Sequence, residues 1–134
     1  MATVNIFKNY QNFEEFPAGH VIFQEGQPGD LMYVVKEGEV DIFIHGQHIE
    51  TVGPGGVVGE MALIDHSARS ATAIAKTACQ LVPLDEERFK IFVHQIPFFS
   101  LQVMRVMADR LRHMNMHLNY LNFAQMRGDV DALI

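Results

Sequence analysis

Cysteine and tryptophan are scarce in this sequence of 134 residues: Cys79 is the only cysteine, and tryptophan is absent. A single cysteine excludes an intrachain disulfide and a cysteine-based zinc site. Its apolar surroundings predict a buried, unreactive thiol. No run of about eighteen uncharged apolar residues occurs, and no basic segment precedes a long apolar stretch at the start, so neither a membrane span nor a secretory signal is expected. We therefore expect a cytoplasmic protein.

Positive charge is also scarce. Ten Lys and Arg stand against sixteen Asp and Glu, which gives a net charge of −6, and residues 1–60 hold only Lys8 and Lys36 as cations. A chain of this charge repels a phosphate backbone unless its basic residues cluster, and they do not. Direct nucleic-acid binding is therefore disfavoured. The length and the 49% hydrophobic content predict a single globular domain over residues 1–134.

Glycine is almost absent after residue 59. Nine of the ten glycines and three of the five prolines lie within residues 17–59, between short runs of β-branched and aromatic residues. Such runs predict strands, here over residues 21–23, 31–35, 40–44, 48–52, 72–75 and 79–82. Closely spaced short strands with glycine-rich turns indicate an antiparallel β-barrel or jelly roll, over about residues 15–84.

The pattern changes to a helical one from Asp85. This residue is a suitable N-cap, and Glu86 and Glu87 follow in the first turn, where acids complement the helix dipole. Pro97 ends this helix and suits the first turn of the next. The long segment 98–124 has neither proline nor glycine, which predicts one long helix. The expected fold class is α+β: a jelly-roll barrel followed by a helical part over residues 85–125.

The most informative segment is 55–72. Its glycines permit close backbone approach to a ligand, and residues 60–64 can form one short helical turn. Arg69 is the only lysine or arginine in the segment, and small residues flank it. A guanidinium with room beside it can hold a phosphate through two hydrogen bonds, and Glu60 could accept one from a sugar hydroxyl. The same residues would also fit a plain turn with a salt bridge.

Two parts of this segment resemble the phosphate-binding cassette of the cyclic nucleotide-binding domain: Gly59-Glu60-Met61-Ala62-Leu63, and Arg69-Ser70-Ala71-Thr72 after a short loop. This family includes the catabolite activator protein, the regulatory subunits of cyclic-nucleotide-dependent kinases, and nucleotide-gated channels. Residues 23–30 and 33–40 resemble the family's two glycine-rich turns. The resemblance covers about residues 15–125. One departure is Val58, where the family usually has an aromatic residue. We interpret this position as one that serves packing.

The resemblance implies a ligand and a role for each matching residue. Arg69 would pair with the exocyclic oxygens of a cyclic phosphate, and Glu60 would accept a hydrogen bond from the ribose 2′-OH. Backbone groups would contribute at Gly59, Ala62 and Ala71, and Ser70 would reach the phosphate or a base edge. The implied ligand-binding residues are Gly59, Glu60, Met61, Ala62, Arg69, Ser70, Ala71 and Thr72, the last beside the base or the pocket wall, with Asn115 of the long helix as a candidate base contact. The ligand is a monoanion, so no metal or cofactor is expected. We expect cAMP, with cGMP as the alternative.

The long helix carries an apolar seam at alternating steps of three and four, formed by Met104, Met107, Leu111, Met114, Leu118 and Leu121. Such a seam can pack on the helix's own barrel or pair two copies of the chain. In the family this helix closes over the base, and in the catabolite activator protein it also pairs two subunits. The resemblance therefore implies a homodimer through the 98–124 helix.

These expectations describe a sensor that is not an enzyme. Few residues follow the long helix, so a DNA-reading domain does not fit, and the chain must signal through an unknown effector protein or be the sensor part of a longer chain. Two alternatives remain: an interaction module that has kept the fold without the ligand, and a metal-dependent enzyme on a jelly-roll scaffold. Neither His45 with His48 nor His113 with His117 forms the clustered ligand set that such an enzyme needs.

Overall fold

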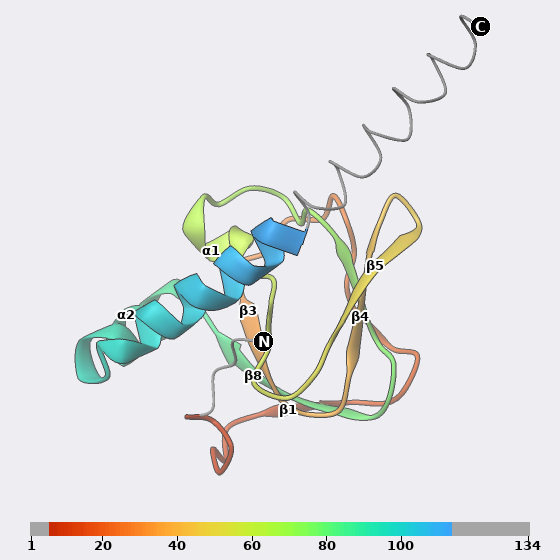
Figure 1. Cartoon of the computed structure of the whole chain (residues 1–134). Coiled ribbons are helices and arrows are strands. Elements are labelled where there is room, and N and C mark those ends of the chain that lie inside the picture. The colour runs from red at the N-terminus through yellow and green to blue at the C-terminus, as the bar shows by residue number, and fades with distance from the viewer. Residues whose placement is uncertain (1–5, 114–134) are drawn as a thin grey trace, which may run out of the picture.

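The computed structural model describes residues 6–113, and its strands form two facing antiparallel sheets of four strands each (Figure 1). The strand orders are β1-β8-β3-β6 and β2-β7-β4-β5. The strands are β1 (Glu14–Phe16), β2 (Val21–Phe23), β3 (Met32–Glu37), β4 (Val40–Ile44), β5 (Gln47–Val52), β6 (Val57–Val58), β7 (Thr72–Ala75) and β8 (Cys79–Leu84). The helices are α1 (Met61–Ile64), α2 (Glu86–Gln95) and a C-terminal helix described over Phe98–His113. The expected fold class, an α+β jelly-roll barrel followed by helices, is confirmed.

The strand predictions are confirmed in position, and two strands were missed. β1 is a three-residue edge strand with two glutamates, and β6 has only two residues, so neither shows an alternating pattern. β8 extends past the predicted end through Pro83, which faces Tyr33 of β3. The neighbouring strand β1 pairs with β8 only as far as Leu81. Pro83 therefore lies where no ladder bond is needed on that side, which is where a strand tolerates proline.

The apolar run that contains β3 is explained by burial on both faces of its sheet. Tyr33 and Val35 point into the barrel core, whereas Met32 and Val34 point outward into a second core under the helices. A sheet covered on both sides requires apolar residues at every position of its central strands rather than at alternate ones. The second core exists because the helices cover this face.

Aromatic residues from three separate segments hold the helices on the outer face of the β1-β8-β3-β6 sheet. Phe7, from the segment before β1, lies edge-on to Phe92 of α2 at 5.0 Å and to Phe99 of the C-terminal helix at 5.8 Å between ring centroids. Val103 and Val106 continue the contact along the C-terminal helix. This packing sets the C-terminal helix beside α1, as Figure 1 shows.

The two helices after the barrel are separate, as Pro97 predicts. The Ile96 N–H still donates to the Phe92 carbonyl, and the chain then bends by 118° into the C-terminal helix. Among the described residues, no single helix has the length and hydropathy to cross a membrane. The required length and hydropathy are reached only when α2 and the C-terminal helix are taken together, across the bend.

Asp85 generates a testable prediction, because its side chain accepts a 2.7 Å hydrogen bond from the Arg88 N–H at the start of α2. Asp85→Ala leaves this N–H without its acceptor, and we expect it to lower the free energy of unfolding by about 1 kcal/mol. Asp85→Asn, which keeps the acceptor, should lose much less. Urea unfolding of the three proteins measures this, and equal losses in the two variants would show that the cap does not stabilise α2.

Candidate ligand-binding site

A cavity of about 670 Å³ lies between the β4–β5 hairpin, the segment around α1, and the C-terminal helix. Its walls are mainly apolar. The β4–β5 hairpin contributes Ile42, Ile44 and Ile49, and the C-terminal helix contributes Met104, Met107 and Leu111. Of the predicted ligand residues within 6–113, all except Thr72 line this cavity. The cavity therefore has an apolar part that suits a flat ring system, next to a small polar part.

Arg69 is the central polar group of the cavity. The residue is only 8% exposed, and its Nη1 donates to the Leu31 carbonyl at 2.8 Å and to the Gly59 carbonyl at 3.3 Å. Its Nε is buried with no hydrogen-bond partner among the described residues, none of which forms an ion pair with this guanidinium. Burial lowers the pKa of Arg69, and the nearby Tyr33 and Asp30 offset this only in part. An arginine remains charged at neutral pH even so, and no carboxylate among residues 6–113 forms an ion pair with it.

The turn that precedes α1 brings Glu60 beside Arg69. Gly59 has φ +77°, a backbone conformation that residues other than glycine rarely adopt. Glu60 then takes the N-cap position, but its carboxylate does not cap the helix. This carboxylate is therefore directed elsewhere, although the residue is 5% exposed. The predicted helical turn at residues 60–64 is confirmed as α1.

Two expected ligand contacts have other partners in the structure. The Ala62 N–H, expected to face the ligand, donates to the Gly59 carbonyl at 3.3 Å as part of the α1 turn. Thr72, expected beside the base or the pocket wall, lies outside the cavity lining, and its hydroxyl accepts a 2.9 Å hydrogen bond from the Glu25 N–H. Both residues thus hold the backbone of the site together. Asn115 lies outside the described residues.

Arg110 of the C-terminal helix is a site residue that the sequence analysis missed. Its Nη1 donates to the Glu60 carboxylate, its Nη2 donates to the Val57 carbonyl at 2.6 Å, and its Nε lies 2.6 Å from an oxygen of Glu50 in β5. The Nε contact is an ion pair with the Glu50 carboxylate.

Burial alone would lower the pKa of Arg110, but the charges of Glu60 and Glu50 outweigh this and hold the pKa above its usual value. One guanidinium thus joins the C-terminal helix to both β5 and the start of α1. The sequence gives little signal for it, because Arg110 is one of several charged residues that flank the apolar seam.

The apolar seam of the C-terminal helix is divided between two environments. Met107 packs partly buried against the outer core, whereas Met104 and Leu111 are 56% and 59% exposed at the edge of the cavity. The expected positions Met114, Leu118 and Leu121 lie outside the described residues. Within the described part, the helix both packs on its own barrel and keeps apolar side chains exposed.

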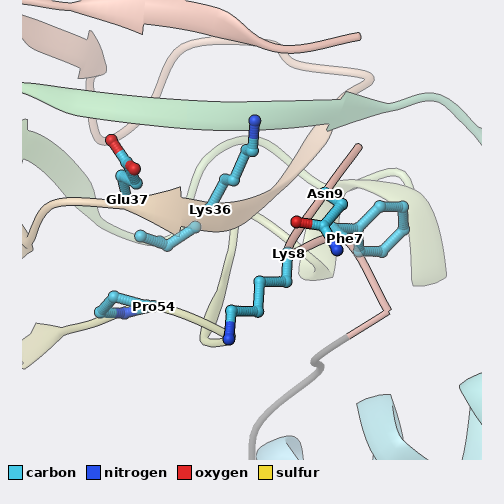
Figure 2. Close-up of a pocket in the computed structure, with 8 residues that line it drawn as sticks. Phe7, Lys8, Asn9, Lys36, Glu37 and Pro54 are labelled. Carbon is cyan, nitrogen blue, oxygen red and sulfur yellow. The ribbon is translucent and has the colours of Figure 1, made fainter. Parts of the chain in front are cut away.

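A second cavity, of about 520 Å³, lies near the segment before β1 and is lined by both cations of the first sixty residues, Lys8 and Lys36. Figure 2 shows that their ammonium groups point away from each other. That of Lys36 lies 4.0 Å from the centroid of the Phe13 ring. The cavity therefore has no convergent pair of positive charges that could hold an anion.

The histidines of the β4–β5 hairpin make separate contacts rather than a metal site. His48 lies 3.0 Å from a carboxylate oxygen of Asp41, and His45 pairs with Glu25 at 3.2 Å. Across residues 6–113, no three His, Cys, Asp or Glu side chains lie close enough together to bind a metal ion.

The fold and the cavity have the form of a domain that binds a small organic anion: a jelly-roll barrel whose glycine-rich cassette holds a buried arginine beside an apolar pocket, with no ion pair to that arginine from the described residues. Comparisons with known proteins give the family. The model of the cyclic nucleotide-binding domain matches residues 13–95. The chain belongs to this family, as its sequence resemblance predicted.

Several relatives are similar to this chain. A CRP-like cAMP-activated global transcriptional regulator of Mycobacterium tuberculosis is 33% identical over 121 residues, which cover 87% of this chain and 54% of the relative. A cAMP-dependent protein kinase regulatory subunit of Eremothecium gossypii is 42% identical over 72 residues, covering 54% of this chain and 16% of that one. The crystal structure of the catabolite activator protein of Thermus thermophilus has a TM-score of 0.72 and 32% identity, covering 84% of this chain and 56% of the other. This chain thus spans little more than half the length of the Mycobacterium tuberculosis regulator and of the Thermus thermophilus catabolite activator protein.

The Arg110 contacts generate a stability prediction. Arg110→Met keeps most of the side-chain volume but leaves the buried Glu60 carboxylate without its cation, and we expect it to lower the free energy of unfolding by about 3 kcal/mol. The matched control is Arg112→Met, since the Arg112 side chain is 76% exposed and its ion pair with Asp109 is long, at 3.6 Å. The control should lose at most about 1 kcal/mol. Chemical unfolding measures both, and equal losses would contradict a structural role of Arg110.

Proposed function

We propose that this domain is a non-catalytic sensor of a 3′,5′-cyclic nucleotide, with cAMP as the favoured ligand. The observation that carries the proposal is the buried Arg69 guanidinium, which lines a largely apolar cavity and forms no ion pair with any described residue. A cyclic phosphate carries one negative charge, so a single guanidinium suffices to neutralise it. The ribose 2′-OH is the hydroxyl that the cyclic diester leaves free, and Glu60 is the nearby acceptor.

The remaining part of the ligand would be the base, in the apolar part of the cavity. The side chains there come from the β4–β5 hairpin and the C-terminal helix, so a bound base would contact both elements at once. Ser70 lines the cavity next to Arg69 and offers a hydroxyl close to the phosphate end. The alternative ligand is cGMP.

The relatives support the choice of ligand. The Mycobacterium tuberculosis protein is named as cAMP-activated and the Eremothecium gossypii protein as cAMP-dependent. Both names describe regulators, which supports a sensor rather than an enzyme. The response would pass to an effector protein or to a further part of a longer chain.

Arg110 supplies a physical route from ligand to response. Its guanidinium is shared between Glu60 and Glu50, and Glu60 is the proposed partner of the ribose. A ligand hydroxyl on Glu60 would change how strongly this carboxylate holds the C-terminal helix. Binding would then shift the populations of helix positions in proportion to the difference in affinity between them.

The ligand proposal predicts that the wild-type protein binds cAMP and that Arg69→Ala binds it at least about tenfold more weakly, because a buried charge loses its partner. The matched control is Arg105→Ala. Arg105 also lies over an aromatic ring, that of Phe98 at 5.3 Å, but outside the cavity. Titration calorimetry with cAMP and cGMP measures all three proteins.

If neither nucleotide binds the wild-type protein, the interaction-module alternative is favoured. A stoichiometric metal in the purified protein would favour the enzyme alternative. Equal affinities of Arg69→Ala and the wild type would remove Arg69 from the site.

The exposed part of the helix seam supports a homodimer. Met104 and Leu111 leave an apolar stripe on the C-terminal helix that a second copy could cover. We expect sedimentation velocity to show a concentration-dependent dimer, and Leu111→Gln to weaken it. Ile91→Gln is the control, because Ile91 is 44% exposed on α2, away from the stripe. A monomer at all concentrations, with and without cAMP, would contradict the dimer.

A further inference from the structure

The guanidinium of Arg69 is held in a narrow slot formed by three residues. Its Cζ lies 4.2 Å from the centroid of the Phe23 ring, which packs against it as a cation–π partner. On another side is Gly29, where an added Cβ would lie 2.2 Å from Nε and 2.5 Å from Cζ. At Gly59, an added Cβ would lie 2.7 Å from Nη1. We call Phe23, Gly29 and Gly59 the guanidinium slot.

The backbone around the slot is tied directly to Arg69. The Gly26 N–H donates to the Arg69 carbonyl, and the Arg69 N–H donates to the Gln27 carbonyl, both at 2.8 Å. The turn between β2 and β3 therefore pairs with the Arg69 backbone on both sides. Since Phe23 lies just before this turn and Gly29 lies within it, the slot and the base of the arginine side chain are held in one rigid unit.

Apart from the slot, only the two carbonyl hydrogen bonds of Nη1 hold this side chain within the part of the chain that the structure describes. An arginine side chain carries about 2 kcal/mol of rotamer entropy, and no carboxylate of the described residues holds this one in place. The aromatic face of Phe23 and the tight approach of Gly29 restrict it to one position. Phe23 is itself steadied by the ring of Tyr33, which stacks with it at 6.4 Å between centroids and 17° between planes.

We propose that Phe23 and Gly29 are positioning residues for the phosphate of the ligand: they fix the Arg69 guanidinium before the ligand arrives. The inference rests on the proposed function. An arginine that is already held loses less freedom on binding, so affinity is higher for the same contacts. Neither residue needs to touch the phosphate itself.

Gly29→Ala is the sharpest variant, because it changes the position of Arg69 without altering the arginine. Gly29 does not have a positive φ, so alanine suits its backbone, and the added methyl group displaces only the flexible end of Arg69. We expect cAMP affinity to fall roughly tenfold. The matched control is Gly53→Ala, where an added Cβ meets nothing within 4 Å, and its affinity should stay at the wild-type value.

Phe23→Leu and Phe23→Tyr test the aromatic face. The leucine variant removes the cation–π contact, and we expect cAMP affinity to fall about three- to thirtyfold. The tyrosine variant keeps the ring and should restore most of the affinity. Thermal unfolding of each variant checks that it is folded at the temperature of the titration.

A double-mutant cycle separates positioning from a general structural role. In the Arg69→Ala background, Gly29→Ala and Phe23→Leu should cause little further loss of cAMP affinity, because their effect acts through the missing guanidinium. Losses that persist undiminished in that background would overturn the inference, as would wild-type affinity in both single variants. Either result would leave the proposed function intact, whereas a wild-type protein that binds neither cAMP nor cGMP would overturn both.

Discussion

A buried positive charge that forms no ion pair within residues 6–113 is the constraint around which this site is built. Taking a guanidinium out of water is costly unless other groups compensate it, and the described residues compensate Arg69 only with two carbonyl groups and the face of Phe23. Glycines occur where the chain must approach this group closely, and the turn between β2 and β3 pairs with its backbone. The barrel thus maintains one cation facing a cavity, and an anion of matching charge completes it.

The same site is linked to the helices through a second arginine. Arg110 lies on the C-terminal helix and binds Glu60 beside the first arginine, while its Nε pairs with Glu50 on the β4–β5 hairpin. The C-terminal helix also packs on the outer face of the sheet through Phe99, so its position is determined by one apolar contact and one ionic contact. Only the ionic contact includes the proposed partner of the ligand. Under the proposed function, this division would let ligand binding act on the helix without disturbing the core.

The parts of the structure that the sequence predicts are those with a local pattern or a family motif. Local propensity predicts the strands with turn residues at both ends, the cap at Asp85 and the helical turn after Gly59. The resemblance to the family predicts the cassette. The two-residue strand β6 is too short to show a period. Arg110 and Glu50 meet across sixty residues of chain, and no local pattern links such a pair. The slot is similar: each of its residues is an ordinary turn or core residue until the fold brings them around one guanidinium.

The most direct test of the central claim observes the Arg69 Nε–H group, which is buried with no acceptor among the described residues. Nitrogen-15 NMR of arginine side chains can follow this group during a titration with cAMP, with Arg69→Ala used to assign the signal. We expect a large downfield proton shift of this one signal as the N–H gains a charged acceptor, saturating at one nucleotide per chain. A signal that stays in place at saturating cAMP would contradict the claim that Arg69 binds the phosphate.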